Sequence, residues 1–148
     1  MDELKKEAVI VDIDGTISNI SHRVHHVIGK NKNWNAFSEL MDRDLPITKN
    51  INRIAYKFGS EYKILFVSGR SQKYKKKTEK WLSDYFYTDE YLLFLRKDND
   101  KRPSFEIKRD ILNNLRKKFI IKYAIDDNEK DLKMYEKEGL ETINPKDL

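Results

Sequence analysis

Two aspartates that directly follow an apolar segment are the residues of this chain best suited to chemistry. Residues 9–16 read Val-Ile-Val-Asp-Ile-Asp-Gly-Thr, so Asp12 and Asp14 stand one residue apart, before Gly15 and Thr16. The apolar run has the length and β-branched content of a buried parallel strand, and a glycine favours a turn after it. Neighbouring carboxylates are costly unless a cation compensates them, and Mg²⁺ prefers such oxygen ligands. The segment therefore predicts a magnesium site at a strand end.

Three more polar motifs occur where a strand is expected to end or a helix to begin. They are Ser68-Gly69-Arg70 after an apolar run, Lys108 at the start of a helical pattern, and Asp126-Asp127 after a further apolar run. Taken singly, each motif is more often a solvated turn or a surface residue. Four polar motifs in this arrangement are hard to produce by chance, so we interpret them together as a catalytic site.

An alternation of strand and helix patterns explains how these distant motifs can meet. Apolar runs predict strands over residues 8–13, 62–67, 91–95, 120–125 and, for a short last strand, 140–143. Helical spacing predicts helices over residues 47–58, 71–84, 104–118 and 128–138, and a polar, helical insert over 17–46 with Asn33 as a cap. This order is typical of an α/β fold with a central parallel sheet and helices on both faces. Because parallel strands end at one edge of the sheet, we expect the motifs to meet there.

Composition sets limits on the class of protein. The 148 residues, 39% of them hydrophobic, suit one folded domain, and the absence of cysteine excludes disulfides, Cys-ligated zinc and thiol catalysis. A net charge of +5 and a pI near 9.2 are compatible with a polyanionic partner. The N-terminal segment lacks an apolar signal core and no run reaches the length of a membrane span, so we expect a cytoplasmic protein without membrane contact.

The order of the motifs resembles that of a known superfamily. DxDGT, then Ser, then Lys, then Asp-Asp is the four-motif series of the haloacid dehalogenase superfamily, and the resemblance extends over the whole chain. It implies a Rossmann-like fold in a single phosphatase domain over residues 1–148, with 17–46 as a small cap-like insert after the first strand. Receiver domains combine similar residues, but their acidic pair comes early in the chain, so we reject that alternative.

The superfamily resemblance implies roles for the matching residues. Asp12 would attack phosphorus and form an aspartyl-phosphate, and Asp14 would protonate the leaving oxygen and then activate water. Since an ordinary aspartate is too acidic for this task, we expect burial beside other carboxylates to raise the pKa of Asp14. Ser68 and Lys108 would each bind a phosphate oxygen, and Lys108 would also orient Asp12.

Magnesium is the expected cofactor. We expect the carboxylates of Asp12 and Asp126 and the main-chain carbonyl of Ile13 to hold it, with Asp127 at the ion or just behind it. Asp14 is a further candidate ligand. The ion would offset the repulsion between Asp12 and an incoming phosphate.

The chain also carries arginines around these motifs, namely Arg23, Arg70, Arg96 and Arg102. Together with the motifs, this pattern resembles the 3′-phosphatase domain of phage-type polynucleotide kinase-phosphatases, which remove a 3′ phosphate from nucleic acid ends. The resemblance implies a magnesium-dependent phosphomonoesterase that acts on DNA or RNA ends. It also implies that these arginines bind the substrate, with Thr16 and Gly69 beside them.

The chain departs from that family in two ways. The family has an aspartate four residues before the lysine of the third motif, where this chain has Ser104, and Asp100 and Glu106 are candidates to replace it. The chain also contains no GxxxxGK[ST] loop, the mark of a kinase half. We therefore expect a stand-alone phosphatase or one that works with a separate kinase or ligase.

Other interpretations stay open. The same site would suit free nucleotides or other small phosphoesters, and a module that binds nucleic acid without catalysis is an alternative of another class. We expect His22, His25 and His26 near the mouth of the site or at the surface rather than on zinc. The lysines over residues 73–80 form either a solvated face or a surface that guides nucleic acid. The oligomeric state is open.

Overall fold

A five-stranded parallel sheet forms the centre of the structure. The computed structural model describes residues 4–148, and its sheet has the strand order β5-β4-β1-β6-β7. The strands are β1 (Lys6–Val11), β4 (Lys63–Ser71), β5 (Tyr91–Arg96), β6 (Phe119–Ile125) and β7 (Glu141–Ile143). The predicted strands and the predicted fold class are confirmed, and the strand that leads into the Asp-x-Asp motif lies in the middle of the sheet. Residues 1–3, the start of the N-terminal segment, lie outside the described residues.

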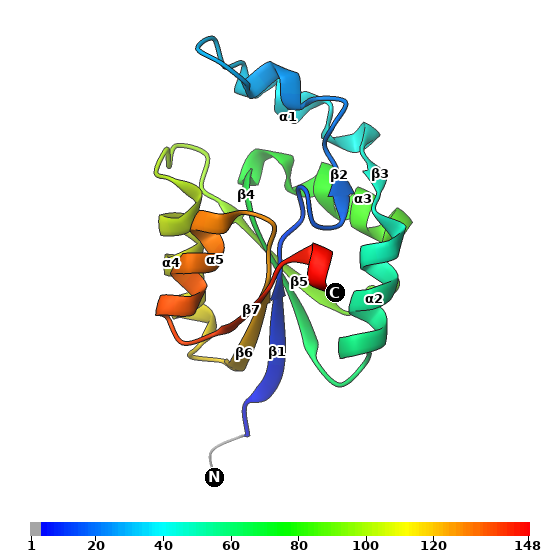
Figure 1. Cartoon of the computed structure of the whole chain (residues 1–148), viewed down its shortest axis with the longest axis vertical. Helices are drawn as coiled ribbons and strands as arrows, with labels where there is room; N and C mark the ends of the chain where they lie inside the picture. The colour runs from blue at the N-terminus through cyan, green and yellow to red at the C-terminus, as the bar shows by residue number, and fades with distance from the viewer. Residues whose placement is uncertain (1–3) are drawn as a thin grey trace.

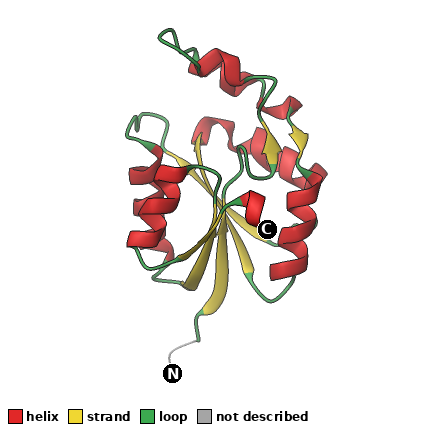
Figure 2. Cartoon of the chain, viewed as in Figure 1, coloured by secondary structure: helices red, strands yellow, loops and turns green. Residues whose placement is uncertain are grey.

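Helices cover both faces of the sheet (Figure 1, Figure 2). α2 (Thr48–Phe58) and α3 (Lys75–Tyr85) lie on one face, and α4 (Ser104–Leu115) and α5 (Glu129–Lys137) lie on the other. The four predicted helices are confirmed with shifted ends. α3 begins later than expected because Ser71 belongs to β4 and residues 72–74 form a 3-10 turn. Within residues 4–148, no helix combines the length and the apolar character needed to cross a bilayer.

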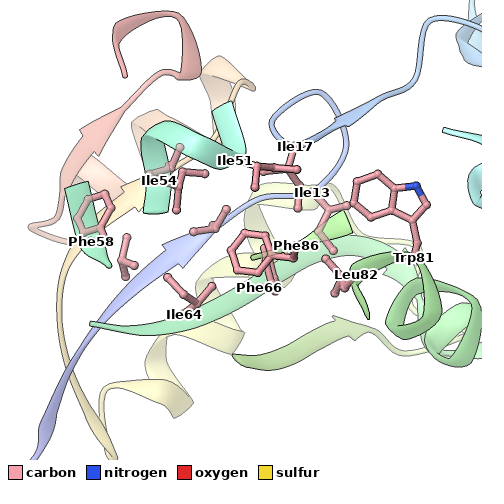
Figure 3. Close-up of a cluster of buried hydrophobic side chains, with 13 residues drawn as sticks. Ile13, Ile17, Ile51, Ile54, Phe58, Ile64, Phe66, Trp81, Leu82 and Phe86 are labelled. Atoms are coloured by element: carbon pink, nitrogen blue, oxygen red, sulfur yellow. The ribbon is translucent and has the colours of Figure 1, made fainter. Parts of the chain in front are cut away.

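Alternate residues of the central strands pack into two separate cores. Val9 and Val11 of β1 join the core that α2 and α3 cover, and Figure 3 shows this core around Phe66 of β4. Ala8 and Ile10 join the second core, under α4 and α5. Because side chains alternate between the faces of a strand, a strand buried on both sides needs an unbroken apolar segment. The apolar run before the Asp-x-Asp motif is such a segment, since its residues fill both cores.

The segment over residues 17–46 consists of short elements, and the prediction of a polar, helical insert was wrong for most of its length. It contains β2 (Ser18–Asn19), a 3-10 turn (Val24–Val27), α1 (Trp34–Glu39), a second 3-10 turn (Met41–Arg43) and β3 (Leu45–Pro46). Gly29 has a φ of 87°, which is incompatible with a continuous helix. α1 begins only after Asn33, whose side chain accepts a hydrogen bond from the Ala36 amide, as predicted for a cap. The antiparallel pair β2–β3 closes the base of the insert, and the rest extends beyond the carboxyl edge of the sheet (Figure 1).

We expect the buried side chains of β4 to contribute much more stability than those at the edge of the sheet. Leu65 of β4 is fully buried, whereas Leu92, its neighbour in β5, is 39% exposed. Leu65→Ala should lower the free energy of unfolding by about 3 kcal/mol, because truncation of a buried leucine leaves a cavity. Leu92→Ala, the matched control, should lower it by about 1 kcal/mol or less. Urea denaturation measures both variants, and equal losses would contradict the expectation.

Candidate active site

Asp12 lies at the carboxyl end of β1 and is 5% exposed. Its amide donates to the Ile125 carbonyl at 2.9 Å, which continues the pairing of β1 with β6. Its Oδ2 accepts a hydrogen bond from the Thr16 hydroxyl at 3.0 Å, and its Oδ1 accepts one from the Lys108 ammonium at 3.1 Å. Because Thr16 is fully buried, it is better placed to orient Asp12 than to contact a substrate directly.

The turn after Asp12 depends on Gly15. Its φ is 83°, and a Cβ at this position would lie 2.1 Å from Oδ2 of Asp127. A side chain here would therefore displace Asp127 and strain the backbone as well. The Ile13 carbonyl accepts hydrogen bonds from three amides of the turn, those of Thr16, Ile17 and Ser18. These bonds fix the direction of the carbonyl, and its role as a metal ligand stays a prediction.

Three carboxylates gather at this edge of the sheet. One oxygen each from Asp12, Asp126 and Asp127 lies within 4.8 Å of the other two. Burial raises the pKa of Asp126 well above its usual range, and the nearby charge of Asp12 adds to the effect. Burial and the charge of Asp12 also raise the pKa of Asp127, to about 7. Carboxylates that repel one another in this way form an all-oxygen donor set, which fits Mg²⁺.

Lys108 of α4 places its ammonium among buried carboxylates. Its side chain is 3% exposed, and Nζ lies 3.1 Å from Oδ1 of Asp12, 2.7 Å from Oδ2 of Asp126 and 2.9 Å from Oδ2 of Asp131. Burial disfavours the charged ammonium, but Asp12 and Asp126 outweigh this penalty and raise the pKa of Lys108 well above its ordinary value. Lys108 therefore stays charged and offsets part of the repulsion within the acidic group.

Asp131 of α5 supplies a buried carboxylate beside Lys108. Ser104, the residue at the family position, donates its hydroxyl to Oδ2 of Asp131 at 2.9 Å, and this oxygen is also the one nearest Lys108. The two predicted substitutes do not take this place, since neither Asp100 nor Glu106 forms an ion pair with Lys108 within the described residues. We missed Asp131 in the sequence because it lies on another helix. Its position four residues after the last Asp-Asp motif was the available signal.

Asp14 faces two arginines rather than the acidic group. Its Oδ1 accepts hydrogen bonds from Nη2 of Arg23 and Nη2 of Arg70, each at 2.7 Å, and its Oδ2 accepts one from Nε of Arg70 at 3.1 Å. Burial raises the pKa of Asp14, but the charges and hydrogen bonds of both arginines outweigh burial, so the pKa lies below its usual value. The prediction of a raised pKa was wrong here because cations, not carboxylates, are nearest. The Asp14 carboxylate is not part of the acidic group formed by Asp12, Asp126 and Asp127.

Asp44, which follows the second 3-10 turn, links the insert to the arginines. Its fully buried carboxylate accepts two hydrogen bonds from Arg23 at 2.7 Å, lies 2.7 Å from Nε2 of His22 and accepts a further bond from the Ser18 hydroxyl. Its carbonyl accepts a hydrogen bond from the Trp81 indole at 2.9 Å, which anchors the insert to α3. We did not anticipate Asp44 because it lies outside the motifs. The indirect signal was that a buried arginine requires carboxylate partners.

Arg23 and Arg70 are buried parts of the site, 0% and 6% exposed. The Arg23 guanidinium lies 4.2 Å from the centre of the Phe37 ring, and its Nη1 donates to the Phe37 carbonyl at 3.2 Å. Nη1 of Arg70 donates to the Thr78 hydroxyl at 3.1 Å. Since each guanidinium nitrogen has a protein partner, these contacts favour a role in positioning Asp14 over direct binding of phosphate.

The segment at the end of β4 is held from two sides. Ser68 is 1% exposed, and its hydroxyl accepts a hydrogen bond from the Arg70 amide at 3.1 Å. The Gly69 carbonyl accepts a hydrogen bond from Nε of Arg96 at 3.0 Å. The register of β4 against β5 shifts over this motif, so its residues leave the regular ladder at the edge of the sheet.

Arg96 and Arg102, the arginines before α4, have structural partners. Nη1 of Arg96 donates to the Asp100 carbonyl at 2.9 Å, which ties the loop before α4 to the end of β4. Arg102 pairs with Asp100 at 2.8 Å and with Asp110 at 2.7 Å. These contacts shape the loop, and the Arg102 side chain, 45% exposed, is the more open of the two to a substrate.

Two clusters noted in the sequence lie on the insert or against it. The rings of His25 and His26 contact each other at a tilt of 39°, with centroids 4.0 Å apart. Within the described residues, no histidine joins the acidic group at the sheet edge. From the lysine-rich segment, Lys77 donates to the Glu39 carbonyl at 3.1 Å, and the Tyr74 hydroxyl donates to the Glu39 carboxylate at 3.2 Å. Part of the lysine-rich face therefore supports the insert.

The fold and the site together define a class. A buried aspartate at the end of the central strand, a buried lysine and an acidic group at the same edge are the features of a phosphatase of haloacid dehalogenase type. The chain belongs to the family of polynucleotide kinase PNKP phosphatase domains, whose model matches residues 6–147. Both resemblances noted in the sequence are thereby confirmed, and the chain is a phosphoric monoester hydrolase by family.

Known proteins and structures resemble most of the chain. The "putative bifunctional polynucleotide kinase/RNA ligase" of Autographa californica nuclear polyhedrosis virus is 25% identical over 138 residues, which are 92% of this chain and 19% of that protein. A chain of the Pnkp1/Rnl/Hen1 RNA repair complex superposes with a TM-score of 0.78 at 28% identity, over 95% of this chain and 43% of that chain. The class C acid phosphatase from Bacillus anthracis shares the fold, with a TM-score of 0.63 at 20% identity, over 84% of this chain and 53% of that one. The chain spans less than half the length of the first two relatives.

We expect Asp44 to be essential for the stability of the insert. Asp44→Asn removes a buried charge that holds two arginines, and breaking a buried ion pair in this way should lower the free energy of unfolding by about 3 kcal/mol. The matched control is Asp42→Asn, because that side chain is 53% exposed and lies 3.8 Å from Lys77. An exposed pair of this kind contributes about 1 kcal/mol or less. Urea denaturation that gives similar losses for both variants would contradict the assignment.

We expect Asp131 to position Lys108. Asp131→Asn should lower kcat/KM toward a small aryl phosphate by roughly tenfold to a hundredfold, because a misplaced Lys108 no longer orients Asp12. Adding Ser104→Asp, which restores the family residue one helical turn before Lys108, should recover most of this loss. Glu129→Gln, an exposed change in the same helix, is the control. A double variant as slow as Asp131→Asn alone, despite a native circular dichroism spectrum, would count against this role.

Proposed function

We propose that this domain removes 3′ phosphates from DNA or RNA ends through an aspartyl-phosphate on Asp12, with Mg²⁺ as cofactor. The position of Asp12 carries the proposal, because it lies 3.1 Å from Lys108 and within 4.8 Å of Asp126 and Asp127 at the end of the central strand. Membership of the PNKP phosphatase domain family supports a nucleic acid end as substrate. We further propose a single domain over residues 1–148, with 17–46 as its small cap.

The first step is attack of an Asp12 oxygen on phosphorus, which breaks the bond from phosphorus to the 3′ oxygen. Lys108 and Thr16 each hold one oxygen of Asp12, at 3.1 and 3.0 Å, so its orientation is set before a substrate arrives. A fixed nucleophile lowers the barrier because less freedom is lost at the moment of reaction. Lys108 and the Ser68 hydroxyl are the groups that we propose to contact phosphate oxygens.

Asp14 is the proposed acid and base. It would give a proton to the leaving 3′ oxygen and later take one from the water that hydrolyses the aspartyl-phosphate, so it returns to its starting state. Arg23 and Arg70 hold its carboxylate in one place, with contacts of 2.7 Å from each. A phosphate that arrives beside Asp14 adds negative charge there, which favours the protonated form that the first step needs.

Asp12, Asp126 and Asp127 would hold the magnesium ion, which when bound supplies positive charge against the repulsion between Asp12 and a phosphate. The protein fixes both oxygens of Asp126, since Lys108 lies 2.7 Å from one and the Asn128 amide donates to the other at 3.0 Å. Asp127 is exposed, so it can adjust to the ion and its water ligands.

A separate kinase or ligase is the proposed partner. The viral relative is named as a kinase and RNA ligase, and the structural relative was solved in an RNA repair complex. A phosphatase that leaves a 3′ hydroxyl would prepare an end for such enzymes.

The test is phosphate release from a 3′-phosphorylated oligonucleotide, with and without Mg²⁺, beside Asp12→Asn. We expect release that requires both the ion and Asp12, and that exceeds release from a nucleoside 3′-monophosphate. Loss of Asp12 should reduce kcat by at least about a thousandfold, as expected when a nucleophile is removed. Activity on mononucleotides alone would move the function to small phosphoesters, and no Asp12-dependent activity on any phosphoester would refute the catalytic proposal.

A further inference from the structure

The outer end of the insert presents an exposed aromatic side chain in a polar, basic setting. We call residues 28–35 the insert tip; all of them are exposed, and Trp34 is 58% exposed. A shallow pocket of about 640 Å³ lies at this tip, lined by Lys30, Asn31, Lys32, Asn33, Trp34 and Asn35. The mechanism proposed above uses none of these residues. Figure 1 shows that this part of the chain extends beyond the carboxyl edge of the sheet, where the acidic group lies.

The first part of the insert, which includes the tip, carries basic residues and no acidic ones. No acidic residue occurs between Asp14 and Glu39, although the chain has 25 acidic residues in all. Within this stretch lie Arg23, Lys30 and Lys32, of which the two lysines are exposed. A stretch of this kind attracts a polyanion, and the next acidic side chains of the insert, Glu39 and Asp42, are paired with Lys77.

A series of contacts connects Trp34 to the candidate acid. The Trp34 and Phe37 rings meet edge to face with centroids 5.8 Å apart. The Arg23 guanidinium lies 4.2 Å from the centre of the Phe37 ring, and its Nη2 is 2.7 Å from Oδ1 of Asp14. Trp34 therefore packs on the residues that position Asp14.

We propose that the insert tip binds the single-stranded nucleic acid that leads to the 3′ phosphate, with one base stacked on Trp34. Lys30 and Lys32 would contact backbone phosphates, and the asparagine side chains would accept or donate hydrogen bonds at base edges or sugars. The inference rests on the proposed function and narrows it. On this proposal a polynucleotide end contacts both the tip and Asp12, and a mononucleotide contacts Asp12 alone.

A protein partner or a second copy of this chain fits the tip less well. Lysine is depleted at protein–protein interfaces, and a stable interface needs a larger apolar centre than one tryptophan offers. A stacking aromatic side chain flanked by basic residues is, in contrast, the usual arrangement for single-stranded nucleic acid.

The kinetic test compares two substrates of the full chain, a 3′-phosphorylated single-stranded oligonucleotide of about ten nucleotides and para-nitrophenyl phosphate. Trp34→Ala should raise KM for the oligonucleotide about tenfold, as the loss of one stacked base predicts, while kcat changes little. Trp34→Phe should recover most of the affinity. Lys30→Gln with Lys32→Gln should raise KM at low salt, and this KM should rise less steeply with salt than that of the wild type. Turnover of para-nitrophenyl phosphate reports any indirect damage through Arg23 and should stay within about twofold.

Matched controls come from α2. Tyr56 is an aromatic residue that is 92% exposed, and Lys49 and Lys57 are exposed lysines on the same helix. Tyr56→Ala, and Lys49→Gln with Lys57→Gln, change the same kinds of residue far from the tip in sequence. We expect no change of KM for the oligonucleotide beyond about twofold in either control.

A binding measurement separates this inference from the proposed function. The chain has two tryptophans, and Trp81 is 2% exposed, so an added oligonucleotide can quench Trp34 alone by direct contact. We expect a 3′-hydroxyl oligonucleotide to quench the fluorescence of Asp12→Asn, and Trp34→Phe to abolish this quenching.

Each outcome is decisive. If the wild type hydrolyses the oligonucleotide but Trp34→Ala leaves its KM unchanged, the inference is overturned and the proposed function stands. If para-nitrophenyl phosphate is the better substrate and no quenching occurs, both are overturned, whereas quenching without oligonucleotide hydrolysis supports the tip alone. A change of oligomeric state in Trp34→Ala, seen by analytical ultracentrifugation, would assign the tip to contact between copies and overturn the inference.

Discussion

Three carboxylates from β1, β6 and α5 converge on the ammonium group of Lys108, at distances of 2.7–3.1 Å. Each of these groups would destabilise the fold if buried alone, so the lysine and the carboxylates must be brought together by one topology. The strand order of the sheet does this, because β1 and β6 are neighbours and α4 and α5 cover the same face. An excess of negative charge stays at the sheet edge, and this excess makes the edge a place for a divalent cation.

A second charge network lies beside the first and has a different balance. Here two guanidinium groups face two carboxylates, those of Asp14 and Asp44. Asp12 and Asp14 are one residue apart in sequence, yet they belong to different networks. The pKa directions follow this division, since Asp126 and Asp127 are shifted up and Asp14 is shifted down. Two environments let similar side chains at one strand end take different tasks.

The sequence predicted the sheet, the four main helices and the convergence of the motifs, because apolar runs and element ends are local signals. It did not predict the networks around the motifs. Asp131 and Asp44 reach the site from elements that the motifs do not mark, and their partners are distant in sequence. The fine geometry of the turn was equally hidden, since three amides donate to the Ile13 carbonyl and no sequence pattern marks these bonds. The prediction of a helical insert failed because a few apolar residues at helical spacing indicated a helix, whereas Gly29 and the turns divide the segment into short elements.

The insert is attached to the domain at its base and along α3, through the β2–β3 pair, the buried carboxylate of Asp44 and the bond from Trp81 to the Asp44 carbonyl. Its exposed end carries none of these attachments. Changes among residues 28–33 would leave both charge networks in place, whereas changes at the base, or at Trp34, which contacts Phe37 beside Arg23, would reach the second network. The proposed substrate contacts at this end can therefore vary while the residues around Asp12 stay the same. Relatives that share every residue around Asp12 need not share a substrate, and the end of the insert is where such relatives should be compared.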